Sequence, residues 1–410
     1  MIFLLTQIIL ACPTNAVCRD VSVPLVNGSA SLKVQQWSYT EEDNIPIYFI
    51  AGGPGQSGVA LAPYIAPLFA RSKRDIIFYE PLGMNEDTEF SCSKASSLEE
   101  IFSQQKTTTQ CVFSKDFSPV DYTSIQSAHH IEAIRRANGH EKIIVLGSSY
   151  GTRIAQLYAQ EYPSAVSAMI LDGALPIGEY IGNSKTAEEV LNLVLKDEGM
   201  TMLQSILVSL LHPIEIPNPF IEKTKSNLFI QRESFLLALH GALYRTSDQH
   251  ALRNTLREIQ EDNWVPFLSG VYKRIQEPYA PGLYLSVFCA EDWRMMCAEN
   301  DSFFPFCQSI TAECTNWPHV EMRYRKTKSI IPTLILQGSR DPVSSLQFAK
   351  DVKEQFPNGY MIAFLEEGHG VSMTTCGRAI VLSFLNRKKE EDLRIRPSCQ
   401  SKIRIHSSDE

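Results

Sequence analysis

The pentapeptide Gly-Ser-Ser-Tyr-Gly at residues 147–151 constrains the fold of this chain more than any other segment. A short apolar run at 142–146 precedes it, and a stretch with helical composition follows at 152–160. In the order strand, tight turn, helix, the pattern G-x-S-x-G forms a sharp turn that exposes its central serine at the carboxyl edge of a sheet. The two glycines relieve crowding around a strained serine backbone. Ser149 is therefore the candidate nucleophile, and the alternative is a glycine-bracketed turn without chemistry.

The rest of the chain predicts an α/β fold with a mostly parallel sheet flanked by helices. Residues 21–39 alternate around Asn27-Gly28, which is typical of a hairpin turn between two strands. Later apolar runs do not alternate, as expected for strands that are buried on both faces of a parallel sheet. These runs are residues 47–51, 75–79, 143–146, 168–171, 333–336 and 360–365. Helical stretches, such as 128–137 and 153–161, separate several of them.

One long interval interrupts this rhythm and predicts an inserted cap. Between Asp172 and about Ser329 the sequence has helical patterns and no obvious parallel strand. An insertion placed after a strand is expected over the carboxyl edge of the sheet, where ligands bind in open α/β sheets. We therefore expect an α/β core at 17–175 and 330–400, with a mainly helical cap at 176–329. The polar tail after Ser401 is expected to fray.

Composition excludes several classes of function. The chain has 410 residues, of which 44% are hydrophobic and 20% are charged, as in a globular protein with a sizeable core. The net charge is −8 and the isoelectric point is about 5.7, without a basic patch, so we expect no nucleic-acid partner. No apolar stretch reaches the roughly 18 residues of a membrane span.

The amino-terminal residues 1–16 are a candidate signal segment. Residues 1–11 resemble the apolar core of a secretory signal, and 14–16 could be its cleavage site. The residues before Cys12 resemble the box that precedes a lipidated cysteine, so a lipid anchor at Cys12 is a further hypothesis. Neither interpretation has the expected positive charge at the start, and a buried first strand is the alternative. Export to the periplasm or secretion is the expected localisation.

Ten cysteines also favour an oxidising compartment. No C-x-x-C occurs and no cysteine pair lies beside a histidine pair, so the spacing does not predict zinc. Local loops could be closed by Cys92 with Cys111 and by Cys376 with Cys399. Cleavage after Ala16 would leave nine cysteines, one of them unpaired. The full disulfide pairing cannot be read from the sequence.

Two residues complete a candidate catalytic triad with Ser149. A serine hydroxyl needs an adjacent base, and the base needs an orienting acid. When a serine lies on such an elbow, the acid and then the histidine follow it along the chain. Asp341 comes after the strand predicted at 333–336, and His369 comes after the one at 360–365, between two glycines. The alternatives are an Asp-Pro turn at Asp341 and an ordinary loop histidine at His369.

A glycine-rich loop supplies the expected oxyanion hole. Tyr150, directly after the nucleophile, should donate one backbone N–H, and the loop after the third strand should donate the other. That loop reads Ala-Gly-Gly-Pro-Gly-Gln-Ser-Gly at residues 51–58. Gly53 is the expected donor, with Gly52 as the next choice. A glycine-rich phosphate cradle is the competing interpretation, and the absence of a following Lys-Ser/Thr pair argues against it.

These motifs together resemble the prolyl aminopeptidase and tripeptidyl aminopeptidase family of α/β-hydrolases. The resemblance rests on 51–55, on Gly-Ser-Ser-Tyr-Gly-Thr at 147–152, on Leu-Asp-Gly at 171–173, on Asp341 and on Gly-His-Gly at 368–370. It covers about residues 21–399 and is weakest at 178–281. The segments 289–292 and 314–318, and the pair Cys376 and Cys399, resemble the tripeptidyl branch.

The resemblance implies removal of residues or tripeptides from the free amino end of short peptides. Such enzymes bind the substrate ammonium through carboxylates in the cap, and Glu291 and Asp292 match that motif. A cation that enters a closing pocket needs an acidic partner. The alternative for both residues is a structural ion pair or a helix cap. No metal or organic cofactor is needed for this mechanism.

Three positions depart from the family pattern. Ala51 stands where prolyl aminopeptidases usually carry a histidine, which favours the tripeptidyl branch. Residues 80–85 read Glu-Pro-Leu-Gly-Met-Asn where the family usually has Asp-x-Arg-Gly-x-Gly, so a loop near the oxyanion strand is expected to be rebuilt. His130 stands where the family often has an acidic residue, and the sequence offers no physical account of it.

Two other functions stay open at this point. An esterase or amidase on small acyl groups would use the same triad and oxyanion hole, and only the carboxylates at 291 and 292 discriminate it from an aminopeptidase. A non-catalytic binding protein on a hydrolase fold is the other hypothesis, motivated by the altered loop at 80–85. The sequence does not indicate how many residues are removed per cleavage, which side chains are preferred or the oligomeric state.

Overall fold

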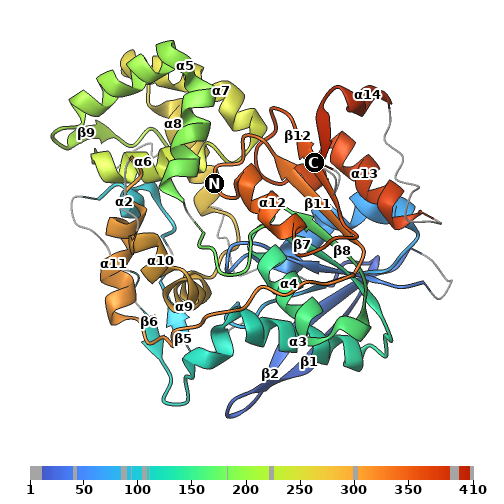
Figure 1. The fold of residues 1–410 in the computed structure, drawn as a ribbon. Helices are drawn as coiled ribbons and strands as arrows, with labels where there is room; N and C mark the ends of the chain where they lie inside the picture. The colour runs from blue at the N-terminus through green and yellow to red at the C-terminus, as the bar shows by residue number, and fades with distance from the viewer. Residues whose placement is uncertain are drawn as a thin grey trace.

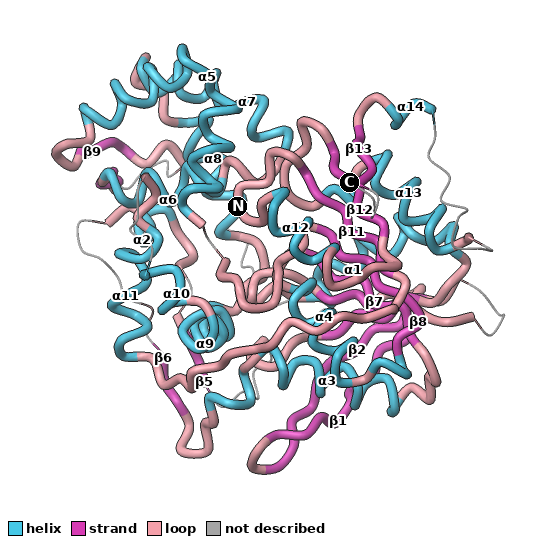
Figure 2. Tube along the Cα trace, in the orientation of Figure 1, coloured by secondary structure: helices cyan, strands magenta, loops and turns pink. Residues whose placement is uncertain are grey.

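A nine-stranded sheet forms the centre of the molecule in the computed structural model (Figures 1 and 2). The structure describes residues 12–39, 44–84, 90–93, 95–103, 109, 111–181, 183–220, 226–298, 303–387 and 397–406. The strands follow the order β1-β2-β4-β3-β7-β8-β11-β12-β13. They are β1 (Ala16–Leu25), β2 (Gly28–Trp37), β3 (Ile47–Ile50), β4 (Ile76–Tyr79), β7 (Ile143–Ser148), β8 (Val166–Asp172), β11 (Thr333–Gly338), β12 (Tyr360–Phe364) and β13 (Ile403–His406).

The middle of this sheet is parallel and its two edges are antiparallel. The pairs β4–β3, β3–β7, β7–β8, β8–β11 and β11–β12 are parallel, so these strands end at the same edge of the sheet. The hairpin β1–β2 turns between Leu25 and Gly28, and Gly28 has a φ of 121°, as the Asn27-Gly28 signal predicts. The hairpin therefore adds two strands at one edge.

Each parallel strand contributes alternate residues to two hydrophobic cores. In β3, Tyr48 and Ile50 pack in one core with helices α3 (Ser124–Ala137), α4 (Gly151–Glu161) and α12 (Leu346–Lys353). Ile47 and Phe49 pack in the other with α1 (Gly58–Ile65) and α13 (Thr375–Leu385). Because both faces are covered, every residue of β3 is buried, which explains why the sequence shows no polar alternation there.

The segment between β8 and β11 has a hydrophobic core of its own, in which Leu191, Phe235 and Leu256 are buried. Its helices lie beside the sheet in Figure 1. They are α5 (Ser184–Ser209), α6 (Arg232–Gly241), α7 (Thr246–Gln260), α8 (Val265–Ile275), α9 (Pro281–Glu291), α10 (Trp293–Ala298) and α11 (Phe306–Asn316). A small antiparallel hairpin of β9 (Ile214–Pro217) and β10 (Asn227–Ile230), which the sequence did not indicate, also belongs to this segment. The segment is therefore mainly but not wholly helical.

Shorter elements connect the core with this segment. A hairpin of β5 (Phe90–Cys92) and β6 (Cys111–Phe113) packs so closely on α9 that a Cβ at Gly282 would lie 2.7 Å from the Sγ of Cys92. The remaining elements are α2 (Leu98–Ile101), α14 (Pro397–Gln400) and the 3₁₀ turns η1 (Ala66–Ser72), η2 (Pro119–Tyr122), η3 (Pro163–Ala165) and η4 (Val371–Met373).

The expectation that the tail after Ser401 frays is wrong for its first residues. Ile403–His406 forms strand β13, which pairs antiparallel with β12 in the register Phe364↔Ile403. An edge strand leaves a row of backbone N–H and C=O groups without partners, and the tail satisfies those of β12. The disulfide Cys376–Cys399 joins the residues just before this strand to helix α13.

All ten cysteines are paired in five disulfides. Both pairs expected from local spacing are present, and the full set is Cys12–Cys18, Cys92–Cys111, Cys289–Cys314, Cys297–Cys307 and Cys376–Cys399. Residues 1–11 of the candidate signal segment lie outside the described residues, and β1 begins at Ala16. Across the described ranges, no helix is both long and apolar enough to span a membrane.

Candidate active site

Ser149 lies on a sharp turn between β7 and α4, as the motif predicts. Its φ is 56°, in the left-handed region that residues with a side chain rarely adopt. Its backbone N–H donates to the carbonyl oxygen of Asp172 at 2.7 Å, and its carbonyl oxygen accepts from the N–H of Thr152 at 2.8 Å. A Cβ at Gly147 would lie 2.5 Å from the carbonyl oxygen of Gly151. The glycines therefore let the turn close around the serine.

Asp341 and His369 form a hydrogen-bonded pair beyond the ends of β11 and β12. The Nδ1 of His369 lies 2.6 Å from the Oδ2 of Asp341, whose side chain has no exposed surface. The Oδ1 of Asp341 accepts the backbone N–H groups of Val343 at 2.8 Å and Ser344 at 2.9 Å. The Ser344 hydroxyl donates to Oδ2 at 2.8 Å. A carboxylate held in this way orients the imidazole and keeps Nδ1 protonated, so Nε2 is the basic nitrogen.

The pair also shifts both pKa values. Burial alone would lower the pKa of His369, but the charge and hydrogen bond of Asp341, together with the charge of Asp172, outweigh burial and raise it above its ordinary value of 6.5. Burial alone would raise the pKa of Asp341, but His369 and the backbone N–H groups of 343 and 344 lower it. The carboxylate is therefore ionised at neutral pH, and the imidazolium form of His369 is stabilised.

Asp172 links the serine turn to the segment after His369, and Gly173 packs against the ring of His369. The carboxylate of Asp172 accepts the N–H of Val371 at 3.0 Å and that of Ser372 at 2.9 Å, just after His369. A Cβ at Gly173 would lie 2.8 Å from the Cε1 of His369. In the described part of the chain no hydrogen bond joins Ser149 with His369.

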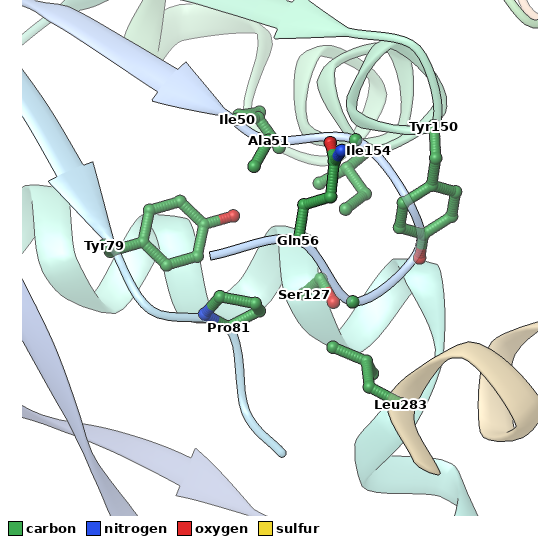
Figure 3. Close-up of a pocket in the computed structure, with 11 residues that line it drawn as sticks. Ile50, Ala51, Gln56, Tyr79, Pro81, Ser127, Tyr150, Ile154 and Leu283 are labelled. Atoms are coloured by element: carbon green, nitrogen blue, oxygen red, sulfur yellow. The ribbon is translucent and has the colours of Figure 1, made fainter. Parts of the chain in front are cut away.

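The glycine-rich loop lies against the serine and borders a small cavity. A Cβ at Gly52 would lie 2.9 Å from the Cβ of Ser149, so only glycine allows this approach. Among the described residues, neither the N–H of Gly53 nor that of Tyr150 donates to another group. Figure 3 shows the cavity between this loop and Tyr79. Its lining residues are Ile50, Ala51, Gly52, Gly55, Gln56, Tyr79, Pro81, Ser127, Tyr150, Ile154 and Leu283.

Glu291 and Asp292 are both buried and both paired with Arg153 of α4. Glu291 is 5% exposed and Asp292 is not exposed at all. The guanidinium of Arg153 donates to Glu291 Oε2 at 3.0 Å and to Asp292 Oδ1 at 2.7 Å. Burial raises the pKa of Asp292 to about 6, against the lowering effect of Arg153. The ion pair named as the alternative at the sequence level is therefore present in the structure.

Further hydrogen bonds connect this charged cluster to the residue after the nucleophile. Glu291 Oε1 accepts the N–H of Ser124 at 2.7 Å and the hydroxyl of Tyr324 at 2.8 Å. The Ser124 hydroxyl donates to Glu291 Oε2 at 2.5 Å and lies 2.8 Å from the hydroxyl of Tyr150. A continuous network thus runs from Tyr150, whose N–H is an oxyanion candidate, to the two carboxylates.

Sequence reasoning gave no role to Arg153 or to the side chain of Asp172. Arg153 is 2% exposed, and it follows the elbow motif on a helix whose neighbouring residues are also buried. A charged residue on the buried side of a helix requires a partner of opposite charge, and this requirement could have indicated a role for Arg153. Asp172 ends the apolar strand β8, where a buried carboxylate needs N–H donors.

Two of the departures from the family pattern have a structural explanation. Glu80 is 8% exposed and accepts a hydrogen bond from the hydroxyl of Ser57, which caps α1 directly after the glycine-rich loop. His130 is 1% exposed, and its Nε2 lies 3.2 Å from the carbonyl oxygen of Pro24. Burial lowers the pKa of His130 to about 4, so its neutral ring can donate to this carbonyl oxygen. An ionised carboxylate could not donate there. Asn85 lies outside the described residues.

Two family models match the chain. The model described as "alpha/beta hydrolase fold" matches residues 45–202, which include Ser149 and the glycine-rich loop. The model described as "TAP-like protein" matches residues 302–394, which include Asp341 and His369. The first range contains strands β3, β4, β7 and β8, and the second contains β11 and β12. Most of the segment between β8 and β11 lies in neither range.

Curated relatives include named peptidases. Serine protease Hip1 from Mycobacterium tuberculosis is 29% identical over 213 residues, which are 44% of this chain and 41% of that protein. The chain thus spans about two fifths of the length of that relative. Proline iminopeptidase from Neisseria meningitidis is 21% identical over 356 residues, which are 85% of this chain and 92% of that protein.

Solved structures with a similar fold include other hydrolases. A Rhodococcus esterase is 14% identical with a TM-score of 0.46, and covers 91% of this chain and 99% of its own. A meta-cleavage product hydrolase from Pseudomonas fluorescens is 14% identical with a TM-score of 0.43, and covers 90% and 97%. The two family models and the parallel sheet with its serine elbow show that this chain has the α/β-hydrolase fold, and the named relatives show that it is similar to peptidases.

Proposed function

We propose that this chain is a serine aminopeptidase that cleaves short peptides from their free amino end through an acyl-enzyme on Ser149. The observation that carries the proposal is the 2.6 Å pair of Asp341 and His369, on loops that follow neighbouring strands of the sheet that presents Ser149. Asp341, His369 and Ser149 then form the triad. The peptidase names of two relatives support a peptide substrate.

In this mechanism His369 acts first as a base and then as an acid. Its Nε2 takes the proton of the Ser149 hydroxyl as the oxygen attacks the scissile carbonyl carbon. The N–H groups of Gly53 and Tyr150 stabilise the oxyanion that forms, because neither has another acceptor among the described residues. The imidazolium then protonates the leaving amine, and water, activated by His369, releases the acyl group from Ser149.

The proposed recognition of the free amino group is electrostatic. Two carboxylates, Glu291 and Asp292, face one guanidinium, Arg153, so the cluster keeps one excess negative charge at neutral pH. The charge lies behind Tyr150, to which the network of Ser124 connects it. A buried charge acts over several ångströms because the protein interior screens it weakly. An ammonium group near Ser149 would be attracted without displacing Arg153.

Chromogenic peptides test this proposal. We expect release from unblocked peptides, loss of release when the amino end is acetylated, and no release by Ser149→Ala. Comparing substrates with one and with three residues before the chromophore then distinguishes the prolyl from the tripeptidyl mode. Equal turnover of blocked and unblocked substrates would contradict the aminopeptidase proposal and favour an esterase or amidase. Failure of a fluorophosphonate to label Ser149 would favour a binding protein without activity.

We also propose that the chain works in an oxidising compartment outside the cytoplasm. Five disulfides support this, because such bonds persist in oxidising surroundings. In the structure the sulfur of Cys12 is bonded to Cys18, so this disulfide and a lipid on Cys12 exclude each other. Cleavage after Ala16 would likewise leave Cys18 unpaired. Thiol counting on the purified protein, with and without reduction, together with amino-terminal sequencing, separates these cases.

A further inference from the structure

The connection between α6 and α7 contacts the loop that carries the catalytic histidine. The carbonyl oxygen of Tyr244 accepts the backbone N–H of His369 at 2.7 Å. The rings of Tyr244 and His369 also meet edge to face, with centroids 5.6 Å apart. A Cβ at Gly368 would lie 2.5 Å from the same carbonyl oxygen, so the two segments are in direct backbone contact. The position of His369 therefore depends on a segment far from it in sequence.

Thr246, the first residue of α7, makes two hydrogen bonds to the residues just before His369. Its hydroxyl donates to the carboxylate of Glu367 at 2.7 Å and accepts the N–H of Gly368 at 2.9 Å. One side chain thus satisfies a donor and an acceptor of the histidine loop. Because Gly368 is followed directly by His369, a shift of its peptide would move the imidazole as well.

Gln249, one turn further along α7, reaches the loop of the catalytic acid. Its amide nitrogen donates to the carbonyl oxygen of Arg340 at 2.8 Å and to that of Leu243 at 2.6 Å. Gln249 is 2% exposed, so these bonds are shielded from water. Arg340 directly precedes Asp341, and its N–H donates to the carbonyl oxygen of Glu367 at 2.9 Å. The start of α7 therefore touches both loops of the acid–base pair.

We propose that Thr246 is a positioning residue for the proposed serine hydrolase reaction, and that it holds the His369 loop in the geometry that Asp341 and Ser149 require. The inference rests on the proposed function. It adds that the segment between β8 and β11 takes part in building the triad as well as in covering it. A misplacement of about 1 Å in a catalytic group can cost about 100-fold in rate.

A pair of substitutions at one position tests the proposal. Thr246→Val keeps the shape of the side chain and removes both hydrogen bonds, whereas Thr246→Ser keeps the hydroxyl. Ser247→Ala is the matched control, because Ser247 is exposed and its hydroxyl contacts only Asp248, at 3.4 Å, among the described residues. We expect Thr246→Val to lower kcat and the rate of fluorophosphonate labelling by about 10- to 100-fold with KM within about twofold of wild type. Thr246→Ser and Ser247→Ala should stay within about threefold.

A second readout does not depend on turnover. The proton shared by His369 Nδ1 and Asp341 gives a far-downfield proton NMR signal that reports the geometry of the pair. We expect this signal to move or broaden in Thr246→Val and to stay unchanged in Thr246→Ser. If Thr246→Val keeps both the signal and the labelling rate of wild type, the positioning role is wrong. A wild-type protein that shows the signal but is never labelled contradicts the proposed function, while the signal in Thr246→Val still decides the positioning role.

Discussion

The backbone N–H of Ser149 donates to the carbonyl oxygen of Asp172 at 2.7 Å. The carboxylate of the same Asp172 accepts N–H groups from Val371 and Ser372, and the hydroxyl of Ser372 as well. One residue at the end of β8 thus holds the strained serine turn on one side and the segment after His369 on the other. The relative position of Ser149 and His369, the proposed nucleophile and base, therefore depends on Asp172.

Asp172→Asn should destabilise the protein and slow its chemistry. Asparagine replaces one carboxylate oxygen with an NH2 group, which cannot accept a hydrogen bond. At least one of the buried N–H groups of Val371 and Ser372 would therefore lose its acceptor. We expect a loss of roughly 1–3 kcal/mol in the free energy of unfolding. Denaturant titration measures the stability, and fluorophosphonate labelling below the unfolding transition measures reactivity at Ser149. The exposed Asp20→Asn is the control, and equal behaviour of the two variants would argue against the structural role of Asp172.

Gly173→Ala should inactivate the enzyme while leaving most of the fold intact. Gly173 has a φ of 68°, and a Cβ there would lie 2.8 Å from Cε1 and 3.0 Å from Nδ1 of His369. The added methyl group would push the imidazole away from Asp341 and cost about 1 kcal/mol or more of backbone strain. We expect at least a 100-fold drop in kcat/KM. Gly139→Ala is a matched control, because its φ is 71° and no atom lies within 4 Å of its added Cβ.

The pH profile should report the coupling of His369 to Asp341. The proposed mechanism needs neutral His369, so kcat/KM should fall as the pH drops through the pKa of this residue, which Asp341 and Asp172 raise above 6.5. Asp341→Asn removes that charge, so the acid limb should move to lower pH. The rate at the plateau should fall by about 10⁴-fold, as in other serine triads that lose the acid. An acid limb that stays in place in Asp341→Asn would show that another group titrates there.

Local patterns explain which parts of the fold and the site could be predicted. The apolar run at 143–146, the glycines around Ser149 and the turn at Asn27-Gly28 each specify their own structure over a few residues. The placement of Asp341 and His369 follows from chain order, because both come directly after predicted parallel strands that end at one edge of the sheet. Their contact was therefore predictable without knowledge of distant residues.

The features that escaped prediction depend on partners far away in sequence. Arg153 meets Glu291 138 residues later, and nothing near Arg153 in the chain indicates that partner. Thr246 belongs to no recognisable sequence motif, and its proposed role depends on a contact with Gly368, 122 residues away. Strand β13 forms because the edge of β12 accepts it, although the tail itself is polar. In each case the tertiary environment decides the role of a locally unremarkable residue.

Glu80→Gln should change how stability depends on pH. Burial raises the pKa of Glu80, against the lowering effects of the Ser57 hydroxyl and Lys33. A carboxyl group with a raised folded-state pKa contributes stability that is present below its unfolded-state value and is lost as the pH rises through the folded-state value. Glutamine does not titrate and keeps an oxygen for Ser57, so its own effect should be constant with pH. The unfolding free energy of Glu80→Gln, relative to wild type, should therefore increase as the pH rises from 4.5 through the folded-state pKa of Glu80.

Denaturant titrations of both proteins across this range measure the difference directly, since groups common to both cancel. Glu215→Gln, at an exposed position, is the control substitution. Because Ser57 caps α1 directly after the glycine-rich loop, a change in the Glu80–Ser57 bond should also reach the N–H of Gly53 and appear in kcat. A stability difference that is flat with pH would mean that Glu80 is ionised in the folded protein at acid pH, and that the altered loop at residues 80–84 tolerates a buried charge beside the oxyanion loop.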